Sequence, residues 1–123
     1  MIHLDTSVLV DSLTGPKRSF PKMRQWIDRG ERLILSTVVL YEWLRGPRLV
    51  EELQAQEVLF PEEMLVAFGP KEARVAADLY RTVKRPRGRE IDLAIAACAI
   101  TYGAALWTLN PSDFADIPSL TVI

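Results

Sequence analysis

The stretch from residue 90 to residue 102 reads EIDLAIAACAITY and decides the kind of fold. After its acidic start every side is apolar, so the helix that it predicts has no polar face and must be enclosed by other elements. Its alanines allow those elements to approach closely, and Gly103 is expected to end it. Asp92, in the first turn, either complements the helix dipole or belongs to a functional site.

Strands and helices alternate on both sides of this buried helix. Short apolar runs between turn residues predict five strands, at 2–4, 32–35, 64–68, 105–108 and 120–123. Helical spacing and capping residues predict further helices after Asp5 and at about 20–28, 36–45, 48–56 and 70–83. This alternation predicts an α/β fold, a three-layer α/β/α sandwich with a central, mostly parallel sheet of about five strands. With no repeat or linker, residues 1–123 form a single domain.

Composition limits the class of protein. The chain has 123 residues, 49% of them hydrophobic, which is enough for a core without metal or disulfide staples. Its only cysteine, Cys98, excludes an internal disulfide and a cysteine-based zinc site and suits a reducing compartment. Because there is no leader-like start and no long apolar run, we expect a cytoplasmic protein that does not enter a membrane.

The formal net charge of −1 hides blocks of opposite sign along the chain. Residues 17–32 carry a net +4 and residues 64–89 a net +5, whereas residues 90–123 contain four acids and no lysine or arginine. An isolated basic run is most often a solvated surface. Here the basic run directly precedes the acidic segment, so binding of phosphates is as reasonable an interpretation as a solvated surface.

Four carboxylates are placed where a parallel α/β fold could bring them together. Asp5 and Asp113 follow strand ends, Asp92 opens the buried helix, and Glu42 interrupts an apolar helix. Each also has an ordinary structural explanation: a helix cap, a dipole partner, or an ion pair with Arg45. Because ligands in such folds bind at the carboxyl ends of the strands, joint placement at one crevice is the functional interpretation.

Clustered carboxylates repel, so a cluster of this kind needs a cation. An all-oxygen donor set, with no cysteine pair and a single histidine, favours Mg²⁺ or Mn²⁺ over zinc. Such an ion activates water and neutralises charge on a phosphodiester. The sequence therefore predicts metal-assisted phosphodiester chemistry, with the number of ions, one or two, left open.

At this point the residues resemble a known family. The runs DTSVL at 5–9, EIDLAIAA at 90–97 and TLNPSDF at 108–114, with Glu42 between them, are similar to PIN-domain ribonucleases, and most of all to the short VapC-type toxins of toxin–antitoxin pairs. The resemblance spans the chain in order. It implies a PIN-like fold and a metal-dependent endoribonuclease, commonly a homodimer, that is silenced by a cognate antitoxin.

The resemblance also implies roles for particular residues. Asp5, Glu42, Asp92 and Asp113 match the family's catalytic and metal-binding acids, Thr6 and Thr108 match supporting polar positions, and Asn110 stands where many relatives carry Asp. A supporting polar role is therefore assigned to Asn110. We expect the RNA phosphates to be held by basic residues: Arg85, Arg87, Arg89, Lys84, Arg45 and Arg48.

Two other interpretations remain. A phosphoacceptor signalling domain is disfavoured because the strand predicted at 64–68 ends without an acceptor aspartate. The stronger alternative is a catalytically degenerate PIN-like domain that binds RNA or protein. His3 and Cys98 are read as core residues, because neither has a catalytic partner or an activating cation nearby in the sequence.

Overall fold

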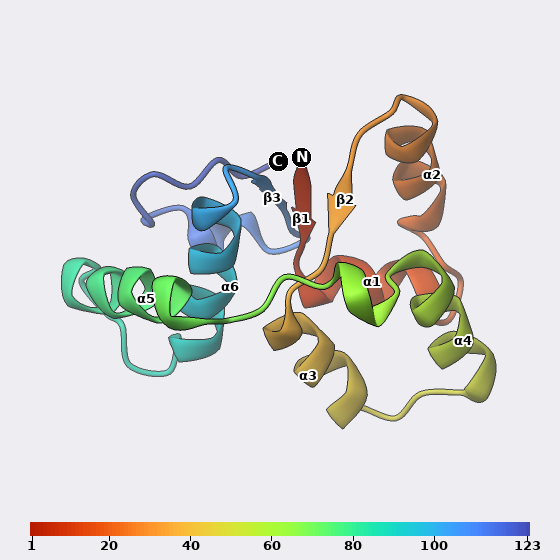
Figure 1. The fold of residues 1–123 in the computed structure, drawn as a ribbon, viewed down its shortest axis with the longest axis horizontal. Helices are drawn as coiled ribbons and strands as arrows, with labels where there is room; N and C mark the ends of the chain where they lie inside the picture. The colour runs from red at the N-terminus through yellow and green to blue at the C-terminus, as the bar shows by residue number, and fades with distance from the viewer.

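The computed structural model describes residues 1–123 and has a small parallel sheet between two groups of helices. The strands are β1 (Ile2–Leu4), β2 (Leu33–Ile34) and β3 (Ala105–Trp107), in the order β2-β1-β3. In Figure 1, α5 (Pro70–Thr82) and α6 (Glu90–Thr101) lie on one side of the strands. The other side carries α1 (Thr6–Leu13), α2 (Phe20–Asp28) and α4 (Val50–Leu59), and α3 (Thr37–Arg45) lies below the sheet in this view. The α/β sandwich expected from the sequence is confirmed.

The sheet is narrower than the five strands predicted. The segment predicted at 64–68 forms a 3-10 helix (Glu62–Met64) and then a single parallel bridge between Val66 and Ser36. The segment predicted at 120–123 likewise forms one bridge, between Val122 and Leu106. Each segment lies beside a neighbouring segment of the chain in parallel, but it pairs through only one residue. Three strands with two single-bridge flanks therefore replace five full strands.

Helix α6 is enclosed, as its composition predicts. Every residue from 93 to 99 is buried, and α5 packs against this helix (Figure 1). The helix ends at Thr101, and Gly103, which follows the C-cap residue Tyr102, has a φ of +63° that glycine adopts at little cost. The N–H groups of Gly103 and Ala104 donate to the carbonyls of Ile100 and Ala99, which satisfies the end of the helix. The buried helix thus presents its first turn, with Asp92, at a fixed position.

Local capping explains the other helix starts near the strand ends. Asp5 caps α1 by accepting the Thr6 N–H at 2.9 Å, and the Ser36 hydroxyl oxygen accepts the Val39 N–H at the start of α3. Helix α4 begins two residues later than predicted, at Val50, because Glu52 accepts the Leu49 N–H at 2.7 Å and fixes the cap there. It also continues to Leu59.

The carboxyl ends of β1 and β2 point toward α1 and α3 in Figure 1, whereas both chain termini lie together at the opposite edge of the sheet. His3 and Cys98 are fully buried, as predicted for core residues. Burial raises the pKa of the Cys98 thiol to about 12, which keeps it protonated and unreactive. No helix is both long and apolar enough to cross a membrane.

Candidate functional site

Asp5 lies at the centre of the candidate site. It follows β1, caps α1 and is only 5% exposed, although it carries no counter-cation. One carboxylate oxygen, Oδ1, accepts the Thr6 N–H, and Oδ2 accepts the hydroxyls of Ser7 at 2.8 Å and Thr108 at 2.7 Å. Three neutral donors thus hold a buried carboxylate in one orientation, which offsets part of the cost of its desolvation.

Glu42 reaches the same place from α3. Its Oε1 accepts the Thr6 hydroxyl at 2.5 Å, and its Oε2 pairs with the guanidinium of Arg45 at 3.2 Å. Its side chain is 18% exposed. Thr6 therefore joins the two acids, since its backbone N–H binds Asp5 and its hydroxyl binds Glu42. The ion pair between Glu42 and Arg45 that the sequence suggested is present, and it coexists with the hydrogen bond from Thr6.

Asp92 and Asp113 are the other two predicted acids, and the pKa of Asp92 shows that they lie near Asp5 and Glu42. The pKa of Asp92 is raised from 3.8 to about 6, first by burial and then by the charges of Asp5, Asp113 and Glu42, with Arg89 acting in the opposite direction. Asp113 lies in an exposed 3-10 helix (Pro111–Phe114) that packs near α6. The structure therefore brings all four predicted acids into one electrostatic neighbourhood, which we call the carboxylate cluster.

The carboxylate cluster is not a ready-made metal site. No group of three or more His, Cys, Asp or Glu side chains is positioned to hold a metal ion. Both oxygens of Glu42 are already bonded, one to Thr6 and the other to Arg45. The chemical type of the cluster nevertheless fits a hard divalent cation, because all of its acidic donors are carboxylate oxygens. The charged form of one of them, Asp92, is disfavoured by the charges of its neighbours, which a cation would offset.

A polar layer beneath the cluster contains one residue that the sequence reasoning missed. The Ser7 hydroxyl donates to Asp5 and accepts the backbone N–H of Leu109 at 3.1 Å, so it links α1 to the segment after β3. Thr108 donates to Asp5 and accepts the Asn110 N–H at 3.0 Å. Asn110 itself is exposed, and its side chain forms no capping bond. The position of Ser7, two residues after Asp5, was the available signal.

The predicted phosphate-binding residues fall into two groups. Three are exposed, in or next to the turn between α5 and α6, and form no salt bridge: Lys84, Arg85 and Arg87. Three are engaged within the chain. Arg45 pairs with Glu42, and Arg48 stacks on the ring of Trp43 and donates to a carbonyl oxygen. Arg89 donates to the carboxylate of Asp116 at 2.6 and 2.9 Å and to the carbonyl of Asp113 at 2.9 Å.

These contacts make Arg89 a clamp between the start of α6 and the Asp113 segment. We expect Arg89→Ala and Asp116→Asn each to lower kcat about tenfold, because each substitution removes a charge-assisted hydrogen bond and loosens the segment that carries Asp113. Cleavage kinetics of both variants measure this. If Arg89 served only to bind phosphate, Asp116→Asn would free it and activity would hold or rise, which contradicts the clamp.

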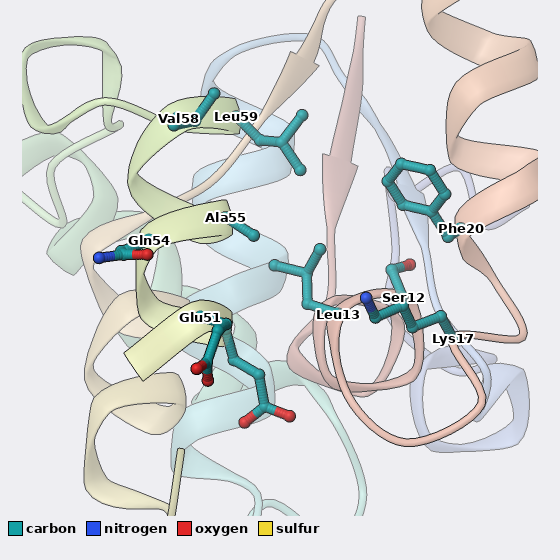
Figure 2. Close-up of a pocket in the computed structure, with 10 residues that line it drawn as sticks. Ser12, Leu13, Lys17, Phe20, Glu51, Gln54, Ala55, Val58 and Leu59 are labelled. Carbon is teal, nitrogen blue, oxygen red and sulfur yellow. The ribbon is translucent and has the colours of Figure 1, made fainter. Parts of the chain in front are cut away.

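A partly apolar hollow lies away from the carboxylate cluster. It is a cavity of about 490 Å³ between α4, the end of α1 and the start of α2, where Leu13, Phe20, Ala55 and Leu59 line the space (Figure 2). Lys17 and Glu51 also line it. None of the four acids of the cluster lines this cavity, so it is a separate feature of the surface.

Comparison with known proteins identifies the family. The PIN domain family model matches residues 2–120. The chain belongs to the PIN-domain family. Among curated relatives, "Ribonuclease VapC19" of Mycobacterium tuberculosis is 33% identical over 119 residues, covering 95% of this chain and 94% of the relative. "Ribonuclease VapC1" of Rickettsia felis is 34% identical over 131 residues, covering 98% of this chain and 92% of the relative.

Solved structures share the whole PIN fold. A VapBC2 crystal structure from Rickettsia felis, bound to a promoter DNA fragment, matches with a TM-score of 0.76 and 22% identity over 100% of this chain and 98% of that chain. A toxin–antitoxin complex from Klebsiella pneumoniae matches with a TM-score of 0.77 and 22% identity over 99% of this chain and 97% of that chain. The fold described above, with its narrow sheet, is therefore shared with these solved structures over nearly the whole length of the chain.

Proposed function

We propose that this PIN domain is an endoribonuclease that hydrolyses RNA phosphodiester bonds with Mg²⁺ or Mn²⁺. One observation carries the proposal: a buried Asp5, fixed by three donors, lies with Asp92, Glu42 and Asp113 in a cluster that raises the pKa of Asp92. A carboxyl group whose pKa is raised by burial and by neighbouring acids is typical of functional sites. The names of the two ribonuclease relatives support RNA as the substrate.

The chain's own residues have distinct parts in this mechanism. Asp5, Glu42, Asp92 and Asp113 would hold the cation, which when bound supplies an activated water and neutralises charge on the phosphate. Ser7 and Thr108 keep Asp5 in one orientation, so its carboxylate needs little reorganisation. Thr6 positions Glu42, and Lys84, Arg85 and Arg87 hold flanking phosphates from the exposed turn.

The proposal extends to partners. We assign the chain to the toxin side of a toxin–antitoxin pair, with a cognate antitoxin that blocks cleavage, since similar folds are found in toxin–antitoxin complexes. We also propose a homodimer. Large apolar side chains on the exposed surface of α3 and the segment after α4 support a self-association surface: Tyr41, Leu44, Met64 and Phe68.

A cleavage assay with purified protein tests the activity. Single-stranded RNA and DNA of one sequence are incubated with Mg²⁺, Mn²⁺ or excess EDTA. We expect internal cuts in RNA with either metal, none with EDTA and none in DNA. Parallel melting curves should show that metal raises the melting temperature, because the ion relieves repulsion among the carboxylates.

Two outcomes would contradict the proposal. Cleavage that persists in EDTA would exclude a metal-dependent reaction. Binding of RNA or metal without turnover on any RNA would instead favour the alternative, a degenerate PIN-like binding module. Asp28→Asn, at an exposed position at the end of α2, serves as the matched control and should cleave like the wild type.

A further inference from the structure

A second hollow, of about 420 Å³, adjoins the carboxylate cluster. It lies between α1, the loop that leads to α2, and the segment after β3. The residues that matter for its chemistry are Thr6, Ser7, Val10, Asp11, Arg18 and Leu109. Its volume falls within the range of about 300–1,000 Å³ that is usual for small-molecule sites.

Two side chains belong to the hollow and to the cluster at once. Thr6 lines the hollow while its hydroxyl donates to Glu42, and Ser7 lines it while its hydroxyl donates to Asp5. Leu109, on the far wall, is tied to Ser7 through its backbone N–H. A ligand in the hollow is therefore in contact with residues that hold the carboxylates, and it lies directly beside the proposed reaction centre.

The lining combines an apolar surface, an acceptor and a cation. Val10 is half-buried and Leu109 is 47% exposed, which leaves apolar surface open to solvent. Asp11 accepts the Ser19 hydroxyl with Oδ2 at 2.6 Å, and its Oδ1 forms no hydrogen bond in the chain. Arg18 is exposed and takes part in no salt bridge. Apolar surface suits a base, a carboxylate suits an amino group, and a free guanidinium suits a phosphate.

We propose that this hollow binds one nucleotide of the RNA next to the cleaved bond, an inference that rests on the proposed function. The base lies against Val10 and Leu109, Arg18 pairs with its phosphate, and Asp11 accepts a hydrogen bond from an exocyclic amino group. Adenine, cytosine and guanine carry such a group and uracil does not, and the one donor of the uracil base, its N3–H, lies between two carbonyl oxygens that repel a carboxylate. The hollow therefore selects against uridine at one position beside the cut.

The basic block around the hollow fits this path for RNA. Two exposed cations, Lys17 and Arg18, lie in the loop that leads to α2, and Arg18 lines the hollow itself. The predicted grip at Lys84, Arg85 and Arg87 lies between α5 and α6. The RNA strand would pass between these two basic surfaces, with the acids of the carboxylate cluster between them. Its affinity for the protein should therefore fall as the salt concentration rises.

Mapping of cleavage sites on a pool of randomised RNA oligonucleotides tests the proposal. For the wild type, we expect uridine to be depleted at one position flanking the cut. Asp11→Asn should remove that depletion, because an amide both donates and accepts. On a single well-cleaved oligonucleotide, Arg18→Ala should raise KM about tenfold with kcat within about twofold, as for the loss of a phosphate contact.

Two further variants keep the result interpretable. Arg24→Ala removes an exposed arginine on α2 that does not line the hollow and should leave KM and the cleavage pattern unchanged. Leu109→Ala trims an exposed side chain, so its folding is not at risk, and it should also raise KM. If the wild type cleaves RNA but Arg18→Ala and Leu109→Ala have the same KM as Arg24→Ala, the nucleotide site is overturned. The proposed function would remain intact.

If the wild type cleaves no RNA, the proposed function fails, and the hollow is then tested by binding alone. Affinity for a fluorescent RNA oligonucleotide, measured by anisotropy without turnover, should fall about tenfold in Arg18→Ala and remain unchanged in Arg24→Ala. Equal affinities for the two variants would overturn the nucleotide site.

Discussion

Asp92→Asn is expected to lower RNA cleavage at least about 1,000-fold, because it removes a charged acid from the centre of the carboxylate cluster. Asn is isosteric but neutral and a poorer ligand for a hard cation. Cleavage rates at saturating RNA and metal measure the effect. Asp28→Asn, which changes the same residue type at an exposed position, should retain the wild-type rate.

The same substitution should leave the fold at least as stable as before. Burial and three neighbouring acids raise the pKa of Asp92 to about 6, so at pH 7 its charge works against folding. Removing it should raise the free energy of unfolding by about 1 kcal/mol, a value reduced because solvent screens this partly exposed group. Urea unfolding of metal-free protein at pH 7 measures this.

These paired results separate a functional acid from a structural one. A loss of activity together with a loss of stability would mean that Asp92 supports the first turn of α6, which contradicts its place in the cluster. Full activity in Asp92→Asn would remove the residue from the site altogether. A stable but inactive variant is the pattern expected of a site that trades stability for function.

Between pH 7 and pH 4 the free energy of unfolding should fall by about 3 kcal/mol more in the wild type than in His3→Leu. The imidazole is fully buried in β1, and neither ring nitrogen has a hydrogen-bond partner. Burial lowers its pKa from 6.5 to about 4. The folded protein thus keeps the ring neutral where the unfolded chain would protonate it.

The sign follows from proton uptake. Between about pH 6.5 and about pH 4 the unfolded chain binds more protons at this site than the folded protein, so stability is lost as pH falls through that window. Below about pH 4 the folded protein also takes up the proton and the loss stops. Asp92 has a raised pKa and acts in the opposite direction, but it is present in both proteins and cancels in the difference.

Unfolding in urea across this pH range measures the difference between the two proteins. Because His3 is the only histidine, its ring-proton NMR signal gives a direct check and should not shift between pH 8 and pH 5. A signal that titrates near pH 6.5 would contradict the buried, neutral ring. Parallel stability curves for wild type and His3→Leu would contradict the linkage.

What the sequence predicted correctly was local in origin. The enclosed helix from 90 to 101 follows from its own composition, and the caps at Asp5 and Ser36 follow from one residue and its neighbours. The placement of Asp92 in the first turn of α6 likewise follows from where that helix begins in the sequence. Such features need no knowledge of distant contacts.

What the sequence did not predict depends on partners far along the chain. Arg89 pairs with Asp116 across 27 residues, so no local spacing in the sequence predicts that the two residues are partners. The bond that Thr108 donates to Asp5 and the bond that Leu109 donates to Ser7 likewise span about a hundred residues. The outer strands shrink to single bridges because short segments gain little from longer pairing at a sheet edge.

The bond from Thr108 to Asp5 has a consequence for the order in which the chain is made. It joins residues 103 positions apart, and β1 pairs with β3 over a similar distance. A ribosome that has released only the first 90 residues has exposed Asp5 and Glu42 but neither Asp92 nor Asp113. The nascent chain at that stage therefore carries half of the acids, and the carboxylate cluster stays unformed until Asp92 and Asp113 have been synthesised.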